Sequence, residues 1–184
     1  MPATLAGLEK KDCSFQLPFP EGEDSYQLIA RLDKVNGHSV RSMRNIRMIR
    51  GNMALNCSAT ASTGENLGAQ YSAKNAVDGN PQTRWSSAFS DPQWLQVDLG
   101  AIHTVNGVEL DWEAAFGKSY EIEVSENGRD FHRVYRTDTG KGGVETIAIT
   151  PQAARYIRLR GLKRGTEYGY SLWEFKVFGK LSGV

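Results

Sequence analysis

The chain has 184 residues and a formal net charge of +1 at pH 7. This length allows one domain, or one domain with a partial second element, and the ordinary apolar and charged fractions argue against disorder. No apolar stretch reaches the length of a membrane-spanning helix. The first ten residues lack the basic start and apolar core of a signal peptide, so the chain is expected to be either cytoplasmic or a piece of a longer protein.

The charge is unevenly distributed. Residues 34–50 hold five basic side chains and no acidic one, whereas residues 52–184 hold fourteen basic and fifteen acidic side chains. The main body therefore lacks the basic footprint of a nucleic-acid-binding domain. From Arg41 to Arg50 the arginines recur every third residue, which fits either a solvated charged face or a surface that recruits an anionic polymer.

Residues 1–51 differ in character from the rest. Residues 25–32 have the composition of a strand, and the Asn-Gly pair that follows is a turn signal. The next apolar segment has a period of three, which fits neither a helix nor a strand. Together they indicate a partly β extension, or the last hairpin of a preceding β-sandwich domain. Cys13 and Cys57 can pair, but two cysteines fix neither a disulfide framework nor a compartment.

From residue 52 onward the chain is predicted to be β-sheet. Short stretches alternate between apolar and polar residues, with turn residues between them. Gly100 is expected to end one strand, and the Asn-Gly pair at 127–128 is a strong hairpin signal. Strands are expected at residues 94–99, 105–112, 120–124, 131–135, 146–149, 156–159 and 173–178. This pattern predicts an all-β fold, an antiparallel β-sandwich of jelly-roll type.

Residues 75–85, with the sequence NAVDGNPQTRW, place several oxygen donors, a glycine and a proline in one short turn. Hard cations such as Ca²⁺ prefer carboxylate, carbonyl and hydroxyl oxygens, so this turn is a candidate cation site. It equally fits a polar surface turn that ends on a core tryptophan, because calcium loops recognisable by motif carry more acidic residues. The spacing leaves both interpretations open.

Several segments in order resemble the discoidin domain, also called the coagulation factor 5/8 type C domain, and most closely its family 32 carbohydrate-binding modules. These segments are residues 52–56 with 59–62, then 75–85, 92–100, 120–125, 154–158 and 168–179. The resemblance covers residues 52–180, and leaves residues 1–51 and the tail at 181–184 outside. It implies an eight-stranded, galactose-binding-domain-like jelly roll with one structural Ca²⁺.

The resemblance also assigns ligands to the Ca²⁺ by position. The turn would supply the backbone carbonyls of Asn75 and Asn80, the carboxylate of Asp78, and the carbonyl and hydroxyl of Thr83. Glu174, far away in the sequence, would close the site from the last strand. Few formal charges and several backbone oxygens suit a rigid site that joins two parts of the chain.

The tryptophans of these segments are interpreted as core residues. Trp85, Trp94 and Trp173 lie in or beside alternating strands, where a large ring buries much apolar area. A platform for sugar rings is the alternative. Arg84 and Asp98 are candidates for buried charges whose partners the sequence does not name.

Loops at one end of such a sandwich are expected to bind the ligand. An aromatic face packs on the C–H surface of a sugar, and charged groups bond its hydroxyls. The predicted carbohydrate-binding residues are Glu65, Phe89, Glu113, Arg164 and Tyr168. Tyr168 is the expected stacking ring and Glu113 the main acceptor, with Glu65 and Arg164 as supporting contacts. The alternatives are a tyrosine that packs on its own loop, a solvated strand end at Glu113, and a buried anchor at Phe89.

The loops also bear on which glycan is bound. Galactose-binding members present a histidine, an arginine and an asparagine around an aromatic ring, but the histidines here, His38, His103 and His132, lie in none of the candidate loops. The Trp-Glu and Tyr-Gly-Tyr segments resemble modules attached to enzymes that degrade β-glucans or chitosan. Glu65 and Glu113 would pair with a glucosamine ammonium. Similar chitosan binders carry a further acid near position 88, where this chain has Ala88.

The predicted function is that of a non-catalytic carbohydrate-binding module, which targets an attached enzyme or surface protein to a β-glucan, a chitosan-like polymer or a galactose-containing glycan. No nucleophile motif or nitrogen and sulfur metal cluster is present, and a glycosidase pair of Glu65 and Glu113 would need a set separation and a cleft. The alternative is a discoidin-type domain that binds phospholipid or a protein partner through apolar spikes at Phe89 and Phe116. The expected location is extracellular or at the cell surface, without a transmembrane segment or a nucleic-acid partner.

Overall fold

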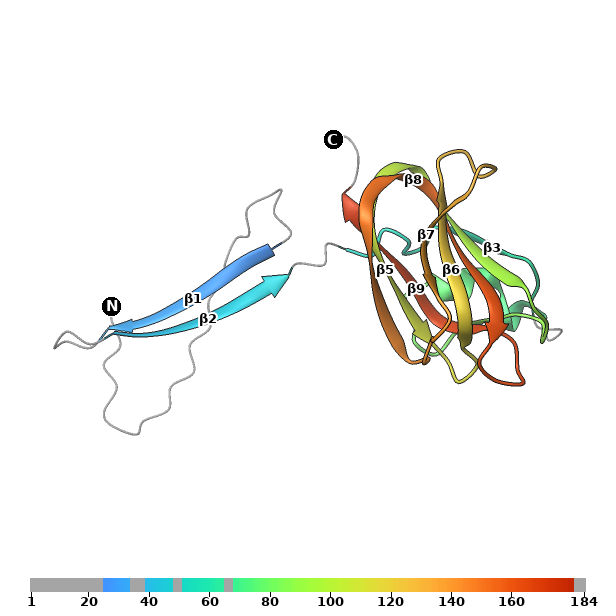
Figure 1. Ribbon diagram of the computed structural model, residues 1–184, viewed down its shortest axis with the longest axis horizontal. Coiled ribbons are helices and arrows are strands. Elements are labelled where there is room, and N and C mark those ends of the chain that lie inside the picture. The colour runs from blue at the N-terminus through green and yellow to red at the C-terminus, as the bar shows by residue number, and fades with distance from the viewer. Residues whose placement is uncertain (1–24, 34–38, 48–50, 65–67, 181–184) are drawn as a thin grey trace. The chain divides into compact units, whose positions relative to one another are not determined.

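The computed structural model describes residues 25–33, 39–47, 51–64 and 68–180, and the chain divides into two units, Met1–Met48 and Ile49–Val184 (Figure 1). In the first unit, β1 (Ser25–Asp33) pairs antiparallel with β2 (Ser39–Arg47). The two predicted segments therefore form a hairpin, and its Asn-Gly turn lies outside the described residues. The interpretation of this hairpin as the end of a preceding domain stays a prediction.

The second unit carries the sandwich. Its elements are β3 (Ser58–Ala61), η1 (Gly68–Tyr71), η2 (Ala73–Ala76), β4 (Trp85–Ser86), β5 (Gln93–Trp112), β6 (Gly117–Ser125), β7 (His132–Thr137), β8 (Val144–Arg164) and β9 (Ser171–Lys180). The strands pair antiparallel in the order β4-β9-β5-β8-β6-β7, and β3 adds to β5. The prediction of an all-β antiparallel fold is confirmed.

Two long strands, β5 and β8, belong to both layers of the sandwich. The first part of β5 pairs with β3 and with the end of β8, whereas residues 104–112 pair with β9 and with the beginning of β8. The prediction that Gly100 ends a strand is wrong. The backbone bends there with a φ of +80°, which glycine adopts at little cost, and β5 continues over the upper end of the domain in Figure 1.

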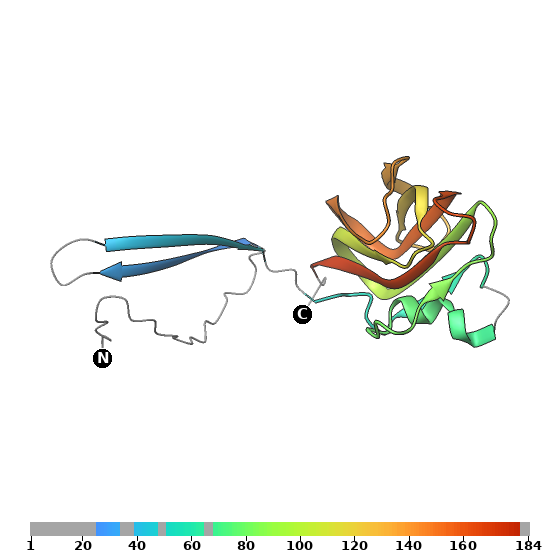
Figure 2. The same ribbon diagram turned by 90° about the horizontal axis from the view of Figure 1, so that it is seen from below.

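The same bending explains the strand count. Residues 146–149 and 156–159, predicted as two strands, are parts of the single strand β8. The described part of the second unit therefore has seven continuous strands instead of the eight that the resemblance implies. The two layers still enclose a common interior, as Figure 2 shows.

The core lies between these layers, and its largest buried side chains include Trp85, Tyr120 and Phe175. Trp85 is thus a core residue, as predicted. Trp94 is only half-buried. Leu95 is buried on the inner face of β5, so Trp94 lies on the outer face, where the guanidinium carbon of Arg158 is 5.1 Å from the centroid of the Trp94 ring.

Trp173 is also half-buried rather than core. The pairing of β9 with β5 shifts register here, since Asp111 faces Glu174 while Trp112 faces Leu172. Trp173 is therefore the extra residue of a bulge, and bulges re-aim side chains relative to the alternation of a regular strand.

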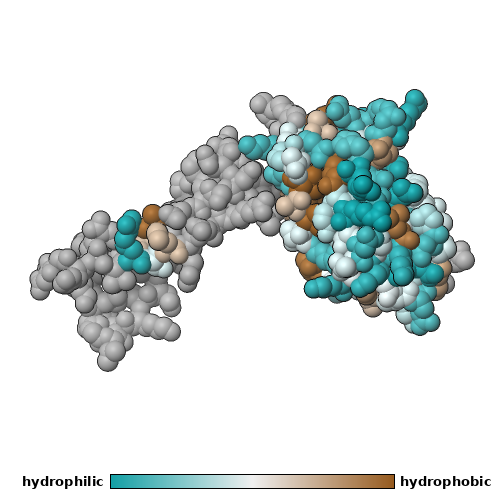
Figure 3. All heavy atoms as spheres, viewed as in Figure 1, coloured by the Kyte–Doolittle hydropathy of each residue, from teal (hydrophilic) through white to brown (hydrophobic). Residues whose placement is uncertain are grey.

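Several charged residues on the outer surface form ion pairs. Asp98 accepts two hydrogen bonds from the Arg155 guanidinium, at 2.7 and 2.9 Å, and this bidentate contact lowers the pKa of Asp98. The partner that the sequence did not name is thus Arg155. The face of the second unit seen in Figure 3 is mostly hydrophilic, with small apolar patches.

Gly161, on β8, packs against the ring of Tyr170. A Cβ at this position would lie 2.2 Å from the Tyr170 Cε1 atom, and Tyr170 is itself fully buried. We expect Gly161→Ala to lower the free energy of unfolding by about 1–3 kcal/mol, the usual cost of overpacking a core. Urea denaturation measures this change. Gly64→Ala is the matched control, because a Cβ there meets nothing within 4 Å, and equal losses in the two variants would contradict the close packing.

Candidate functional site

Loops at one end of the sandwich form a cavity of about 240 Å³. The connections from β5 to β6 and from β8 to β9 lie together at the lower end of the domain in Figure 1. The cavity is lined by Arg84, Ser86, Phe89, Glu113, Ala114, Ala115 and Tyr168. The structure thus brings together three of the five residues predicted to bind carbohydrate, Phe89, Glu113 and Tyr168.

Two aromatic rings from different loops meet at this cavity. The rings of Phe89 and Tyr168 pack edge to face, with centroids 5.8 Å apart and an interplanar angle of 82°. Phe89 is 49% exposed and Tyr168 is 52% exposed. Phe89 is therefore no buried anchor, and Tyr168 packs on a neighbouring loop. Their geometry fits a platform for a sugar ring, which stays a prediction.

Glu113 is a half-buried acid held at the end of β5. Its Oε2 atom accepts the backbone N–H of Ala115 at 3.2 Å. The turn itself is fixed to β9, because the N–H of Glu113 donates to the Ser171 carbonyl and the N–H of Ser171 donates to the Ala115 carbonyl. No ion pair to Glu113 is formed by a described residue. The cavity therefore holds a positioned carboxylate that no described residue pairs with, and the Arg84 guanidinium lies in the same lining.

Arg84 is a cavity residue that the sequence analysis treated as a buried charge. It is half-buried, donates to the Ser171 hydroxyl at 2.7 Å, and places its guanidinium carbon 4.3 Å from the centroid of the Tyr71 ring. The sequence signal that could have placed Arg84 at this site is its position directly after the oxygen-rich turn and before the core residue Trp85. The guanidinium is thus held rigidly beside the cavity, where it can donate to a polar ligand.

Arg164 bonds to the loops beside the cavity. It is absent from the cavity lining, and its Nη1 atom donates to the carbonyls of Glu167 and Tyr168 at 2.9 and 3.1 Å. Its Nε atom reaches Asp91 at 3.4 Å, and Asp91 also accepts the Tyr170 hydroxyl at 2.5 Å. Arg164 therefore ties the loop of Tyr168 to the loop that carries Phe89, and its contact with a ligand stays a prediction.

We expect Arg164→Ala to weaken ligand binding several-fold without altering the ligand preference. The truncation removes the hydrogen bonds that fix the Tyr168 loop, each worth about 1 kcal/mol net in stability. Urea denaturation and calorimetric titration measure the two effects. Arg129→Ala, in an exposed turn, is the control, and a changed preference among ligands would indicate direct contact by Arg164.

Glu65 and the histidines complete the predictions about the binding loops. Glu65 lies outside the described residues. His132 is exposed on β7, with its Nε2 atom 2.6 Å from the Gln152 Oε1 atom, and His103 lies opposite Ala154 on β8. Neither of these histidines lines the cavity.

The oxygen-rich turn is held by its own hydrogen bonds. Asp78 accepts the Asn80 N–H at 2.9 Å and the Thr83 hydroxyl at 3.0 and 2.8 Å, and the Asn80 carbonyl accepts the same hydroxyl at 3.0 Å. Oxygens of Asp78, Asn80 and Thr83 are thereby concentrated in one small region. Asn75, in η2, uses its side-chain amide to donate to the carbonyls of Gln70 and Arg84.

Glu174, on β9, is buried near this turn. It is 6% exposed, and neither of its carboxylate oxygens meets hydrogen-bond geometry with a donor in the described chain. Burial raises the pKa of Glu174, the nearby Gly79 N–H offsets this in part, and the charge of Asp78 raises the pKa further. Two carboxylates close together, one of them buried without a partner, are unfavourable unless a cation lies between them. The residues present therefore fit a hard, oxygen-liganded cation such as Ca²⁺.

Comparison with known proteins connects this geometry to a family. The family model of the F5/8 type C domain matches residues 58–175. Chitosan-binding module 1 of a chitosanase/glucanase from Paenibacillus sp. IK-5 is 50% identical, with a TM-score of 0.68 over 71% of this chain and 100% of that module. Module 2 of that enzyme, solved with chitotriose, is 39% identical, with a TM-score of 0.67 over 70% of this chain and 100% of the module.

A curated relative is much longer than this chain. The polysaccharide lyase 8 family protein HylA of Enterococcus faecalis is 32% identical over 119 residues, which are 60% of this chain and 9% of that protein. The resemblance inferred from the sequence is confirmed. In the described part of the chain, no helix has the length and hydropathy needed to cross a membrane.

Proposed function

We propose that this chain, which belongs to the F5/8 type C domain family and is a non-catalytic carbohydrate-binding module, binds chitosan or a closely related β-linked polysaccharide. The observation that carries the proposal is the carboxylate of Glu113, which forms no ion pair with a described residue, beside the exposed rings of Phe89 and Tyr168. The rings offer a face to the C–H surface of a sugar, and the carboxylate forms strong charge-assisted hydrogen bonds to an ammonium or hydroxyl group. The chitosan-binding modules at 50% and 39% identity support this choice.

The charges around the cavity favour an aminosugar over a neutral one. No described residue forms an ion pair with Glu113, although Arg84 lines the same cavity, so a protonated glucosamine unit can pair with the carboxylate directly and reduce the cost of its desolvation. Arg84 donates to sugar hydroxyls in the same cavity. No described histidine lines the cavity, which supports the sequence-based argument against galactose.

Isothermal titration of the full chain tests the proposal. Oligomers of glucosamine, β-glucan oligomers and galactose are titrated in parallel. The largest heat and highest affinity are expected with the glucosamine oligomers. Binding of β-glucan oligomers without glucosamine oligomers would move the assignment to a neutral glucan, and no heat with any of the three would contradict carbohydrate binding at this cavity.

The phospholipid alternative requires exposed apolar side chains at Phe89 and Phe116, and Phe116 is not exposed. Phe116 is half-buried and packs against the core. The backbone of Gly165 lies so close to it that a Cβ on Gly165 would be 2.4 Å from the Phe116 ring. Phe89 remains exposed, but its ring packs against Tyr168. Sedimentation with anionic liposomes distinguishes the two functions, since retention without glycan binding would favour the lipid.

We also infer a structural Ca²⁺ in the second unit. Its ligands would be the carbonyls of Asn75 and Asn80, the carboxylates of Asp78 and Glu174, and the oxygens of Thr83. The ion would supply positive charge between the two carboxylates and join the turn to β9. Support comes from the oxygen-rich turn and the unpartnered buried carboxylate of Glu174.

In its natural setting the module is proposed to be extracellular or at the cell surface, attached to a catalytic or surface protein. A weak module is sufficient there, because tethering raises the effective concentration of the attached protein at a polysaccharide. The polysaccharide lyase relative, of which the match covers 9%, is consistent with a module inside a longer chain. Deletion of the module from the parent protein tests the proposed targeting role, and loss of adsorption to insoluble polysaccharide is the expected result.

A further inference from the structure

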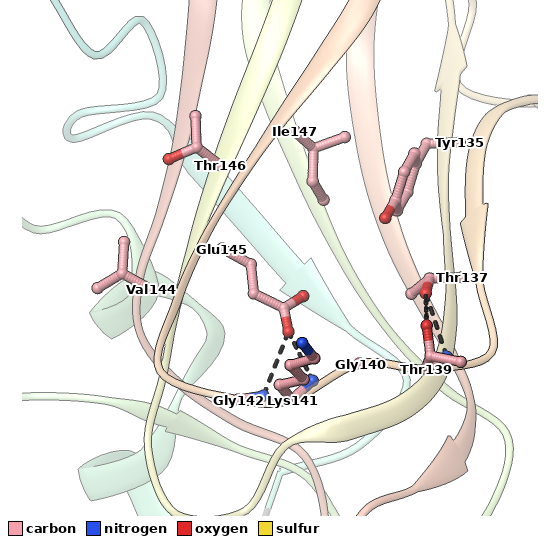
Figure 4. Close-up of a pocket in the computed structure, with 10 residues that line it drawn as sticks. All are labelled: Tyr135, Thr137, Thr139, Gly140, Lys141, Gly142, Val144, Glu145, Thr146 and Ile147. Atoms are coloured by element: carbon pink, nitrogen blue, oxygen red, sulfur yellow. Dashed lines mark hydrogen bonds between the residues drawn. The ribbon is translucent and has the colours of Figure 1, made fainter.

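A second cavity, of about 370 Å³, lies between β7 and the beginning of β8 (Figure 4). Tyr135 and Thr137 stand on one wall, and Glu145 and Ile147 point toward them from β8, whereas Val144 and Thr146 lie on the other side of that strand. These walls are the edges of the two layers, because β7 ends the strand order next to β6 and residues 144–148 of β8 pair with β5. The second cavity shares no lining residue with the cavity of Glu113.

The two cavities flank one turn, residues 113–116. This turn lines the first cavity, and its two ends are bonded to the loop around the second. The N–H of Trp112 donates to the Gly143 carbonyl, and the N–H of Gly140 donates to the Lys118 carbonyl, both at 3.0 Å. The loops from β5 to β6 and from β7 to β8 therefore lie at the same end of the domain, as Figure 1 shows.

One aromatic ring packs between the loops of the two cavities. A Cβ on Gly142 would lie 3.0 Å from the ring of Phe116, and a Cβ on Gly165 would lie 2.4 Å from the same ring. Gly142 lines the second cavity, and Gly165 begins the loop that carries Tyr168. Phe116 thereby fixes the spacing of the two cavities.

The second cavity has a rigid polar floor. The Oε1 atom of Glu145 accepts the N–H groups of Lys141 and Gly142, at 2.8 and 3.2 Å, and the other oxygen accepts the Tyr120 hydroxyl. The formal charges of Lys141 and Glu145 cancel. The carboxylate is thus held in place, and the cavity carries no net formal charge from its lining residues.

The walls offer hydroxyl groups and apolar surface together. Thr137 and Thr139 line the cavity with hydroxyl groups that lie 3.3 Å from each other and keep further capacity to donate or accept hydrogen bonds, whereas the Thr146 hydroxyl donates to Glu109 on β5. Tyr135 supplies a half-buried ring, and the apolar side chain of Ile147 points toward it from β8 (Figure 4). This combination matches a pyranose, which has hydroxyl groups at its rim and a C–H face.

We propose that the second cavity is a further sugar subsite, which binds a hydroxyl-rich unit of the same polysaccharide whose other units lie against Glu113 and Tyr168. The proposal rests on the proposed function, because the first cavity must bind a glycan. A polysaccharide that passes over the turn at 113–116 contacts both cavities. Once one sugar unit is bound, binding of a second unit of the same molecule is intramolecular, so affinity rises with oligomer length.

Calorimetric titration of the full chain with glucosamine trimer and hexamer tests the second subsite. Thr139→Trp adds a large ring at an exposed position of the cavity lining. The hexamer is expected to bind the unchanged chain at least about fivefold more tightly than the trimer, whereas Thr139→Trp binds both with the affinity of the trimer. Thr150→Trp, at an exposed threonine of β8 outside both cavities, is the matched control and retains the length dependence.

Amide NMR on the unchanged chain gives a second readout, which does not depend on the folding of a variant. The signals of Lys141 and Gly142, whose N–H groups donate to Glu145, should shift with the hexamer and stay in place with the monomer. Signals that stay in place with the hexamer would overturn the second subsite and leave the proposed function intact. The same conclusion would follow if Thr139→Trp bound the hexamer as tightly as the unchanged chain while Glu113→Gln weakened binding of both glucosamine oligomers. Failure of the unchanged chain to bind any oligomer would overturn both.

Discussion

Addition of EDTA to the full chain is expected to lower the melting temperature of the sandwich and to leave glycan affinity nearly unchanged. A ligand at 100 times its dissociation constant stabilises a fold by about 2.7 kcal/mol, and each kcal/mol shifts the midpoint by roughly 2–4 °C for a domain of this size, so the loss is roughly 5–10 °C. The physical reason is the buried carboxylate of Glu174, whose oxygens meet hydrogen-bond geometry with no described donor and which lies near Asp78.

The pH dependence without Ca²⁺ follows from the same carboxylate. Burial holds the pKa of Glu174 above its ordinary value, so the folded state retains a proton that the unfolded state has lost. Stability in EDTA is therefore greatest when Glu174 is protonated, and it falls as the pH rises from the ordinary pKa of a glutamate through the raised one. Scanning calorimetry in EDTA should give a higher melting temperature near pH 5 than at pH 7.

Glu174→Gln isolates this effect. The neutral amide removes the buried charge and one of the proposed ligands, so the variant should melt at nearly the same temperature with and without EDTA. Glu126→Gln, in an exposed turn, is the control and should keep the full response to EDTA. An EDTA response that survives in Glu174→Gln would contradict the proposed ligand set. A parallel loss of glycan affinity would show that the cation belongs to the binding site.

The all-β class was predictable because it rests on local alternation, but the paths of the long strands were not. Gly100 carries the turn signal of a strand end, and only the pairing of both halves of β5 with β8 shows that the strand bends and continues. The half-burial of Trp173 depends on a register shift between β9 and β5. Both features are set by contacts between distant parts of the chain, which a local pattern does not contain.

The candidate site was predictable to the extent that loops could be placed at one end of the fold. Phe89, Glu113 and Tyr168 come from three loops that the resemblance places together, and the structure brings them into one cavity. Arg164 was predicted as a supporting ligand contact from its place in a candidate loop, and the structure adds protein partners that the sequence did not name, two backbone carbonyls and Asp91. A side chain with five donors can satisfy either role, and tertiary contacts decide between them.

Glu113→Gln is expected to reduce the affinity for glucosamine oligomers by about tenfold or more, equivalent to about 1.4 kcal/mol. The glutamine amide still bonds hydroxyl groups, but it cannot pair with an ammonium group, so β-glucan oligomers should lose little. Binding of glucosamine oligomers should also weaken with added salt in the unchanged chain, and much less in the variant, because salt screens the charge pair. Titration at two salt concentrations measures all of these changes.

Tyr168→Ala is expected to weaken both classes of oligomer to a similar extent, because ring stacking does not depend on the charge of the sugar. The Tyr168 side chain is 52% exposed, so its truncation should change the free energy of unfolding by no more than about 0.5 kcal/mol. Ile102→Ala, at an exposed apolar residue of β5 outside the cavity, is the matched control. Selective loss of glucosamine oligomers in Tyr168→Ala, or equal loss of both classes in Glu113→Gln, would mean that the ring and the carboxylate do not divide recognition into stacking and charge.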